Sequence, residues 1–480
     1  MLLNNDDYLR VDAGYNRKGL EIRLNEGTYK VEYPAIVWGS LDDDAKKLIV
    51  DHVAFMSTSY LPLVLKKKGI IYNTRQPMLE SFAFKSTIYD LPSSALLDGY
   101  PTVDYLQRYY NTDFIFEGGE TVVYGKGYKP RNKAIISFTS GKESLLTLAV
   151  CMELGIEPIL VNVVEPSNLY EEKHRRKLLK KMEAEFGVEY YMLRHEPGAF
   201  HDGRKMGYKP SSLGWGNQLL YYLFIFLPFM LRNKARYVFY GNEYSCDKEA
   251  PHPEGFRTNY CYDQSSGWTL QLDSVARILT RGSARVGSLV GPLNEIAVTK
   301  VLHEGFPDLA KYQMSCFCED PPAEEHRWCC ACSKCARTNA FIRGLGYDPG
   351  RVGFWKDMFT EEHKGLFSAL KGPQSHSKSA MDIPKTSDLP ADVGFDRSGL
   401  GREEQELAFY LAAQREPENR FLQEYMKTSI YNGVSGEGGA GNERFRRDYE
   451  FYMTPQPYRA IPSELSDRVY SLYNHILREN

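Results

Sequence analysis

The stretch that organises this chain is Ala134-Ile135-Ile136-Ser137-Phe138-Thr139-Ser140-Gly141-Lys142-Glu143-Ser144-Leu145-Leu146. An apolar run precedes small hydroxyl residues, a glycine and a lysine, and a helical pattern then continues to Leu154 and ends at Gly155. The pattern predicts a strand, a tight loop and a helix. Unpaired N–H groups at a helix start attract anions, and hydroxyls and Lys142 add donors and charge. This favours a phosphate loop for a nucleotide, with an ordinary capped turn as the alternative.

Strand and helix patterns alternate from 130 to about 312. The expected strands are 134–138, 158–164, 188–193 and 236–240, with a helix at 169–186. This alternation predicts an α/β fold with a doubly wound parallel sheet, in which ligands bind at the carboxyl ends of the strands. The residues expected to bind the nucleotide are Thr139, Ser140, Gly141, Lys142, Glu143, Ser144, Asn162, Gly241 and Asn242, and Glu165 and Glu243 are expected at the same strand ends.

The rest of the chain divides by composition. Residues 1–125 are expected to form a mixed α+β domain, with strands at 29–33 and 35–38 and a helix at 42–60, for substrate recognition or for a homodimer. Residues 313–371 hold most of the cysteines. A linker rich in Ser, Pro and Gly follows at 372–401. Residues 402–480 are expected to be helical, at 403–427 and 462–477, around a glycine-rich and mobile 432–442.

Composition excludes some classes of protein. The 480 residues are 42% hydrophobic and carry a net charge of −3, which does not favour a general nucleic-acid binder. The longest apolar run, 219–231, contains Pro228 and is too short to cross a bilayer, so it is expected to be a buried helix. The polar first ten residues do not resemble a signal peptide. These features predict a cytoplasmic protein without a membrane partner.

Six of the nine cysteines fall between Cys316 and Cys335. Their clustering in a long chain without an export signal favours a metal site over disulfides. The C-x2-C-x2-C spacing predicts four thiolates around one structural zinc ion, with either Cys318 or Cys330 as a possible replacement for one ligand. An iron–sulfur cluster and scattered free cysteines are the alternatives. The expected ligands are Cys316, Cys329, Cys332 and Cys335.

The loop resembles the PP-loop of the ATP pyrophosphatases, which is usually written SGGKDS after an aromatic or apolar residue. Gly141, Lys142 and Ser144 match this pattern. Thr139 and the acidic residue at 143 are conservative departures, since one keeps the hydroxyl and the other the carboxylate. Ser140 stands where the pattern has glycine, so its side chain is expected either to crowd the anion or to donate to it.

A PP-loop followed by this cysteine pattern resembles the 7-cyano-7-deazaguanine synthase group and, more closely, the UDP-N-acetylmuramoyl-L-alanyl-L-glutamate epimerase family. The resemblance covers roughly 130 to 345. The matching segments are 241–243 (Gly-Asn-Glu), 292–295 (Pro-Leu-Asn-Glu), 328–335 (Trp-Cys-x-x-Cys-x-Lys-Cys) and the Tyr-, Gln- and Ser-containing 259–267.

The resemblance implies that ATP, with Mg²⁺, adenylates a small-molecule carboxylate and releases pyrophosphate, with charge stabilised by Lys142, Ser144 and the backbone near Gly141. For the epimerase, the substrate is a nucleotide-linked peptide whose terminal glutamate loses and regains its α-proton, and AMP is released. Candidate acid and base residues are Glu243, Asp247, His252 and His201. Amide or nitrile formation, as in the deazaguanine enzymes, and nucleotide binding without turnover are the alternatives.

Overall fold

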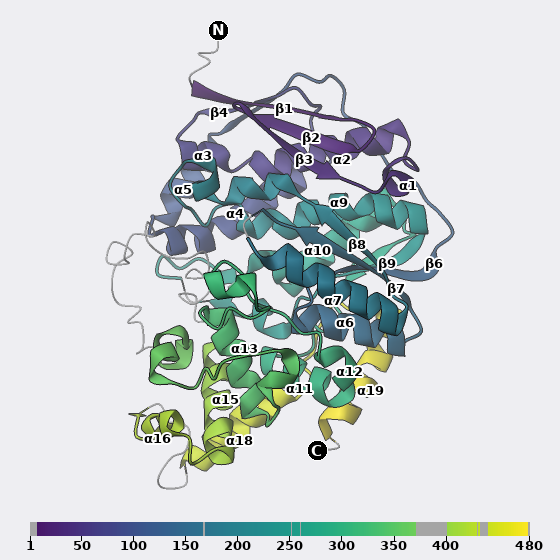
Figure 1. Ribbon diagram of the computed structural model, residues 1–480. Coiled ribbons are helices and arrows are strands. Elements are labelled where there is room, and N and C mark those ends of the chain that lie inside the picture. Colours follow the sequence, from purple (N-terminus) through teal and green to yellow (C-terminus); the bar gives the residue numbers. More distant parts are fainter. Residues whose placement is uncertain are drawn as a thin grey trace.

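The computed structural model describes residues 7–166, 169–250, 252–259, 261–370, 401–429, 431–432 and 440–478 (Figure 1). It is an α/β structure with two five-stranded sheets and a two-stranded hairpin. The N-terminal sheet lies at the top of Figure 1, the second sheet lies across the middle, and the C-terminal helices lie below it. We call the second sheet the central sheet.

The central sheet is parallel throughout, as predicted, and its strand order is β12-β9-β6-β7-β8. The chain runs from β6 outward to β7 and β8, and then returns to the other side of β6 for β9 and β12. The direction of winding therefore reverses between β6 and β9, which is where ligands bind in sheets of this kind. Four of its strands were expected and the short β12 was not: β6 (Arg131–Ser137), β7 (Glu157–Val164), β8 (Glu189–Arg194), β9 (Ala235–Phe239) and β12 (Arg285–Gly287).

Alternate side chains of the central sheet enter two different hydrophobic cores, because side chains of a strand point to opposite faces in turn. Ala134 and Ile136 belong to one core and Ile135 to the other. The first core is covered by α6 (Lys142–Glu153), α7 (Glu171–Phe186) and α11 (Glu295–Gly305). The second is covered by α9 (Gln218–Asn233) and α10 (Ser266–Leu279), and α9 contains the apolar run that was expected to be a buried helix.

The N-terminal sheet is mixed, with the order β3-β2-β1-β4-β5. Its strands are β1 (Tyr8–Tyr15), β2 (Gly19–Leu24), β3 (Gly27–Glu32), β4 (Gly69–Tyr72) and β5 (Asp113–Phe116). The accompanying helices are α1 (Ala35–Trp38), α2 (Asp43–Thr58), α3 (Leu61–Leu65), α4 (Glu80–Asp98) and α5 (Thr102–Tyr110). Helix α2 begins after Asp42, whose carboxylate accepts a hydrogen bond from the N–H of Ala45, as expected of an N-cap.

The prediction of a strand at 35–38 was wrong, because this segment is the short helix α1. The carbonyl of Pro34 accepts hydrogen bonds from the N–H groups of Val37 and Trp38, at 2.9 and 3.0 Å. The Trp38 indole is buried and donates to the carbonyl of Asn16 at 2.8 Å. One turn of helix buries the neighbouring Val37 and Trp38 together, which the alternating faces of a strand would not allow.

The N-terminal region packs tightly on the central sheet. Helices α2 and α9 lie against each other, and side chains of both regions form the second core. The domain boundary at 125 therefore crosses a shared core and stays a prediction. The helical stretch Asp43–Leu65 is apolar and long enough to span a membrane by composition alone, but 89% of its apolar window is buried inside the protein, as in a core helix.

The C-terminal region is helical. Its helices are α12 (Pro307–Ala310), α13 (Ser333–Gly344), α15 (Arg402–Arg415), α16 (Arg420–Met426), α18 (Ala440–Met453) and α19 (Ser463–Arg478). A single helix at 403–427 was expected, but α15 and α16 are separate because Pro417 interrupts the pattern and Asn419 caps α16. Residues 372–400 of the predicted linker and 433–439 of the glycine-rich segment lie outside the described residues.

Short elements complete the connections around the strand ends. Helix α8 (Gly203–Met206) lies between β8 and α9, and the hairpin consists of β10 (Glu249–Ala250) and β11 (Thr258–Asn259). The 3-10 helices are η2 (Glu196–His201), η3 (Trp215–Asn217), η4 (Tyr244–Asp247), η5 (Tyr262–Gln264), η6 (Pro321–Glu324), η7 (Pro349–Val352), η8 (Glu361–Leu366) and η9 (Ser368–Leu370).

Candidate functional site

A cavity of about 640 Å³ lies at the carboxyl edge of the central sheet. It opens where the winding direction reverses, between the segments that follow β6 and β9. Its walls also include α4 of the N-terminal region and α13 beyond the cysteines. The lining residues from the expected site are Thr139, Gly141, Lys142, Glu143, Ser144, Gly241, Asn242 and Glu243. The structure therefore brings to this cavity seven of the nine residues that were expected to bind a nucleotide, together with Glu165 and Glu243.

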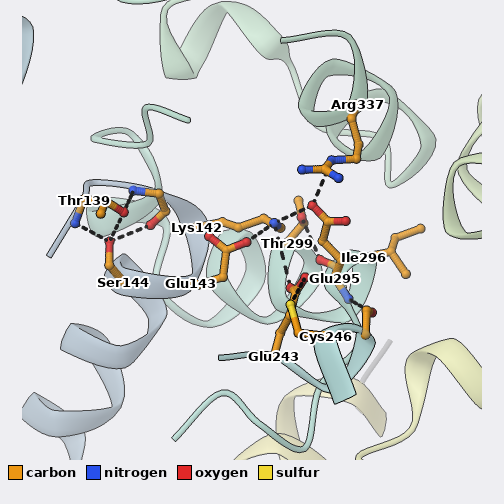
Figure 2. A network of polar contacts seen from close by, with 12 residues as sticks. Thr139, Lys142, Glu143, Ser144, Glu243, Cys246, Glu295, Ile296, Thr299 and Arg337 are labelled. Carbon is orange, nitrogen blue, oxygen red and sulfur yellow. Dashed lines mark hydrogen bonds and ion pairs between the residues drawn. The ribbon is translucent and has the colours of Figure 1, made fainter. Parts of the chain in front are cut away.

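The 139–144 loop is held by its own hydroxyl groups. The N–H of Thr139 donates to Ser144 Oγ at 3.2 Å, and that hydroxyl donates to the carbonyl of Gly141 at 3.1 Å (Figure 2). The N–H of Gly141 approaches Thr139 Oγ1 at 3.4 Å. Helix α6 begins directly after Gly141, so its first N–H groups face the cavity side of the loop. Serine and threonine here stabilise a compact turn at a helix start.

Ser140 adopts a left-handed backbone conformation, with φ of 58°. A side chain is unfavourable in this region, which explains why glycine suits this position. Ser140 is fully buried, and its hydroxyl has no hydrogen-bond partner among the described residues. Its carbonyl accepts a hydrogen bond from the N–H of Met314 at 2.8 Å. The residue does not line the cavity, so its hydroxyl is packed beneath the loop rather than directed at a ligand.

Gly241 allows the end of β9 to approach the first turn of α6. A Cβ atom placed on Gly241 would lie 2.8 Å from the Cβ of Glu143, which is closer than real Cβ contacts. This close approach brings Glu243, two residues further on, to the side chain of Lys142. The glycine of the 241–243 segment therefore has a packing role that positions the neighbouring glutamate.

Lys142 is buried among three carboxylates (Figure 2). Its Nζ contacts the carboxylate of Glu143, lies 2.8 Å from Glu295 Oε1 and lies 3.9 Å from Glu243 Oε2. Glu295 is the first residue of α11, and its Oε1 also accepts from Arg337 Nε at 3.1 Å. We call Glu143, Glu243 and Glu295 the glutamate triad. Each member comes from a different strand end or helix start, and all meet at one lysine.

Charges at the triad shift the pKa values of Lys142, Glu243 and Glu295. Burial lowers the pKa of Lys142, but the three carboxylates outweigh burial and hold it above its usual value. Burial raises the pKa of Glu243 well above its usual range, because Lys142 only partly compensates for the loss of water. Burial acts in the same direction on Glu295, yet Arg337 and Lys142 hold the pKa of Glu295 below its usual value. Glu295 is therefore the ionised partner, and Glu243 is the carboxyl that most readily keeps a proton.

The triad has the donor set of a divalent cation site. Its carboxylate oxygens lie within 4.8 Å of one another. Glu243 Oε2 and Glu295 Oε2 are buried without a hydrogen-bond partner among the described residues. Buried oxygens of this kind are costly unless a ligand satisfies them. Hard divalent cations take carboxylate oxygens as ligands, so these residues could hold a metal ion.

The second candidate centre consists of Cys316, Cys329, Cys332 and Cys335, as expected, and we call it the four-cysteine cluster. The Sγ–Sγ distances are 4.0 Å for 316–332, 3.7 Å for 329–335 and 3.5 Å for 332–335. A tetrahedral zinc site with Zn–S bonds of about 2.3 Å has edges of about 3.8 Å. All four cysteines are free and buried. The cluster therefore fits a metal ion such as zinc.

Backbone N–H groups point at the sulfurs of the cluster. Cys316 Sγ accepts from the N–H groups of Cys318 and Cys329, at 3.2 and 3.3 Å. Cys332 Sγ accepts from Cys335 N at 3.4 Å and thereby caps the start of α13. Such donors favour thiolates, which are the metal-binding form. Cys318 and Cys330 lie outside the cluster, so neither replaces a ligand as the sequence had left open.

The candidate acid and base residues fall in different places. Glu243 lines the cavity, but Asp247 does not, because its carboxylate accepts from the N–H of Ser266 at 2.8 Å at the start of α10. His252 also lies outside the cavity lining, with Nε2 at 3.1 Å from Thr102 Oγ1. His201 does line it. Both of its ring nitrogens are engaged by Tyr60 and Tyr221, and burial lowers its pKa to about 4, so it stays neutral.

The two asparagines of the expected site also differ. Asn242 lines the cavity and donates to Thr269 Oγ1 at 3.1 Å. Asn162 is outside the cavity lining, is buried, and donates to the carbonyl of Phe138 at 2.8 Å. Asn162 therefore joins β7 to the base of the 139–144 loop and supports the loop from below.

Sequence reasoning missed the half of the cavity that faces the N-terminal region. Asp90 and Asp98 of α4, Arg204 and Trp215 line it together with Asp263 of η5. Burial raises the pKa of Asp90 to about 6 and the pKa of Asp263 to about 8. This wall places polar and aromatic groups beyond the end of the 139–144 loop.

Two residues at the triad were also missed. Glu295 was noted only within the 292–295 segment, and Arg337 was not singled out at all. The available signal for Glu295 was its place directly after Asn294, a residue type common at helix N-caps, since α11 begins there. Neither a scan of protein-family models nor a search of curated proteins returns a match to this chain.

Proposed function

We propose that this protein is a PP-loop ATP pyrophosphatase that activates a substrate carboxylate by adenylation. The observation that carries the proposal is the position of Lys142: at the N-terminus of α6, at the reversal point of a parallel sheet, with the glutamate triad beside it. A helix start with a lysine suits phosphates, and a carboxylate triad suits the cation that accompanies them.

In this reaction, the loop, the triad and the far wall of the cavity would each have a separate role. The first N–H groups of α6 and Lys142 would bind and neutralise the departing pyrophosphate, and Ser144 and Thr139 would keep the loop closed around it. The triad would hold Mg²⁺, which supplies charge neutralisation at the phosphates when it is bound. The substrate carboxylate would approach from the half of the cavity lined by Asp90, Asp263 and Arg204.

For the substrate, we propose the terminal L-glutamate of UDP-N-acetylmuramoyl-L-alanyl-L-glutamate, which is epimerised after activation. The support for this choice is the resemblance of segments 241–243, 292–295 and 328–335 to the epimerase family. Glu243 is the remaining candidate acid or base that touches the cavity beside Lys142. A carboxylate that ligates Mg²⁺ cannot accept a proton at the same time, so ligand and base are alternative roles for Glu243.

Two other functions remain as alternatives. A ligase or amidase of the 7-cyano-7-deazaguanine synthase type would use the same adenylation and then ammonia, without proton transfer at carbon. Nucleotide binding without turnover is favoured by a specific observation: the ammonium of Lys142 is committed to Glu143 and Glu295 in the structure. Activity therefore requires that a cation or a phosphate displaces at least one of these contacts.

The test is a pyrophosphate-release assay with ATP, Mg²⁺ and UDP-N-acetylmuramoyl-L-alanyl-L-glutamate, run in ²H₂O. Pyrophosphate release with deuterium at the glutamate α-carbon supports the epimerase. Release only with a deazapurine carboxylate and ammonia supports the ligase. ATP binding without release from any of these carboxylates contradicts adenylation and leaves the non-catalytic function.

Two variants connect the assay to the site. Lys142→Ala is expected to abolish pyrophosphate release, whereas Lys177→Ala on the exposed face of α7 should leave it unchanged. Glu243→Gln separates the two roles of Glu243. If the residue is the base, pyrophosphate release persists and deuterium exchange is lost; if it is a cation ligand, the Mg²⁺ concentration required for release rises.

A further inference from the structure

We propose that metal binding at the four-cysteine cluster is energetically coupled to the 139–144 loop. The metal-bound cluster holds the loop in its compact form, and an anion on the loop in turn tightens metal binding. Two separate chains of contacts lead from the cysteines to the loop, and each reaches a different part of it. The choice of nucleotide as the anion rests on the proposed function, but the coupling between cluster and loop does not.

The first route runs through the segment before Cys316. The N–H of Met314 donates to the carbonyl of Ser140 at 2.8 Å. Ser315 Oγ faces Gly141, at 3.4 Å from where a Cβ on that glycine would lie, and is buried without a hydrogen-bond partner among the described residues. Cys316 follows immediately. The first metal ligand is therefore two residues from a backbone hydrogen bond that fixes Ser140 in its left-handed conformation.

The second route runs through α13. The Cys332 thiol caps this helix, and Cys335 lies in its first turn. Two residues after Cys335, Arg337 Nε lies 3.1 Å from Glu295 Oε1, the same oxygen that accepts from Lys142 Nζ at 2.8 Å (Figure 2). A metal ion that fixes the start of α13 thus fixes the arginine that orients the carboxylate partner of Lys142.

The cysteine segment contains little regular secondary structure, and side-chain packing and single hydrogen bonds, such as that between Trp328 Nε1 and the carbonyl of Val352, tie it to its neighbours. Between Lys311 and Cys332 the regular structure is the four-residue helix η6, and both Cys318 and Cys330 adopt left-handed conformations, with φ of 55° and 53°. Left-handed backbone at residues other than glycine is unfavourable and persists only where surrounding ties impose it. Four metal–sulfur bonds are the strongest ties available here, because structural metal sites contribute directly to local folding.

Coupling between two binding sites is reciprocal, so it predicts effects in both directions. Loss of the metal should release Met314 and α13 and thereby loosen the loop. An anion that fixes the loop should slow release of the metal. Couplings between sites in proteins are typically about 5- to 150-fold, and we take about fivefold as the smallest effect that supports the proposal.

The first experiment follows amide hydrogen exchange of the full-length protein without any nucleotide, before and after zinc is removed with a chelator. Peptides covering 139–146 are expected to exchange at least about fivefold faster after removal, while peptides of β1 and β2 keep their protection. Unchanged exchange at 139–146 would overturn the proposal. Because no nucleotide is present, failure of the proposed function leaves this result intact.

Arg337→Gln tests the second route while keeping all four thiols, and therefore keeps the proposal testable if chelation unfolds the protein. This variant should retain its zinc by elemental analysis and still show faster exchange at 139–146. Cys330→Ser is the matched control, since Cys330 lies beside the cluster without belonging to it, and it should change neither zinc content nor exchange. Wild-type exchange in Arg337→Gln would contradict the route through α13.

The reciprocal experiment measures zinc release to a chromogenic chelator with and without Mg²⁺ and inorganic pyrophosphate. Release from the wild-type protein is expected to slow at least about fivefold when both are present, and this slowing should shrink in Arg337→Gln. Equal release rates at pyrophosphate concentrations that demonstrably bind would overturn the coupling. Absence of pyrophosphate binding, together with metal-dependent exchange at the loop, would contradict the proposed function alone.

Discussion

Ser140→Gly should make this protein more stable, although it removes a side chain from a buried position. Ser140 is fully buried with φ of 58°, and its hydroxyl has no hydrogen-bond partner among the described residues. Both features oppose the folded state. Glycine adopts this conformation freely and brings no hydroxyl, so the substitution removes both penalties at once.

The magnitude follows from three contributions. Relief of the left-handed conformation is worth about 1–2 kcal/mol, and removal of an unsatisfied buried hydroxyl about 1–3 kcal/mol. Against these, glycine gives the unfolded chain more conformational freedom, which costs about 0.5–1 kcal/mol. The loss of one Cβ and one Oγ from van der Waals contact reduces the gain further. The expected net effect is a stabilisation of about 1–3 kcal/mol.

The assay compares Ser140→Gly and Ser140→Ala with the wild type by thermal and urea denaturation. Alanine removes the hydroxyl but keeps the strained Cβ, so Ser140→Ala isolates the hydroxyl contribution and the further gain in Ser140→Gly isolates the backbone contribution. The order of stability should be Gly, then Ala, then wild type. A glycine variant less stable than the wild type would refute the reasoning, because it would mean that the hydroxyl or the Cβ makes a favourable contact that outweighs both penalties.

Three further predictions concern the metal, the loop and the far wall of the cavity. Cys332→Ser should lose zinc by elemental analysis, whereas Cys330→Ser should keep it; equal zinc in both would exclude the four-cysteine cluster as the site. Gly241→Ala should destabilise the protein by about 1–3 kcal/mol and lower its melting temperature, because its Cβ would lie 2.8 Å from the Cβ of Glu143. Burial raises the pKa of Asp263 to about 8, so between about pH 4 and pH 8 the folded chain holds a proton that the unfolded chain has lost, and stability falls as pH rises through this window. The melting temperature of Asp263→Asn relative to the wild type should therefore be higher at pH 8 than at pH 5, and an equal difference at both pH values would contradict the shift.

Local patterns predicted the parts of the structure that depend on near neighbours in the sequence. The strand, loop and helix around 134–154 were readable because apolar periodicity changes at a glycine and a lysine. The four-cysteine cluster was readable because three of its members are separated by two residues each, a spacing typical of zinc ligands. The helix at 35–38 was misread because one turn is too short for a period of 3.6 residues to be distinguished from alternation.

Contacts between distant segments were not predictable in this way. Asp90 lies in α4 of the N-terminal region and Asp263 lies in η5, far along the sequence. The two residues meet because η5 packs against α4. Nothing in the sequence around either aspartate distinguishes it from a solvated surface residue. The role of Arg337 was equally unpredictable, because it depends on the direction in which α13 leaves the cysteine turn. The positions of these residues at the cavity depend on the topology of the sheet and on the path of the chain across it.

The charges of the glutamate triad affect which ligands the candidate site can bind. Three carboxylates, those of Glu143, Glu243 and Glu295, meet at Lys142 and Arg337, and Lys334 also acts on Glu295 from nearby. A bare polyphosphate would be repelled from such a cluster, even though the start of α6 attracts it. Under the proposed function, a divalent cation would offset this repulsion, because it would satisfy the buried carboxylate oxygens and let Lys142 turn toward the phosphates. The proposed function therefore predicts that anion binding at the 139–144 loop depends on a cation, which the sequence of the loop alone, with its lysine and hydroxyls, did not suggest.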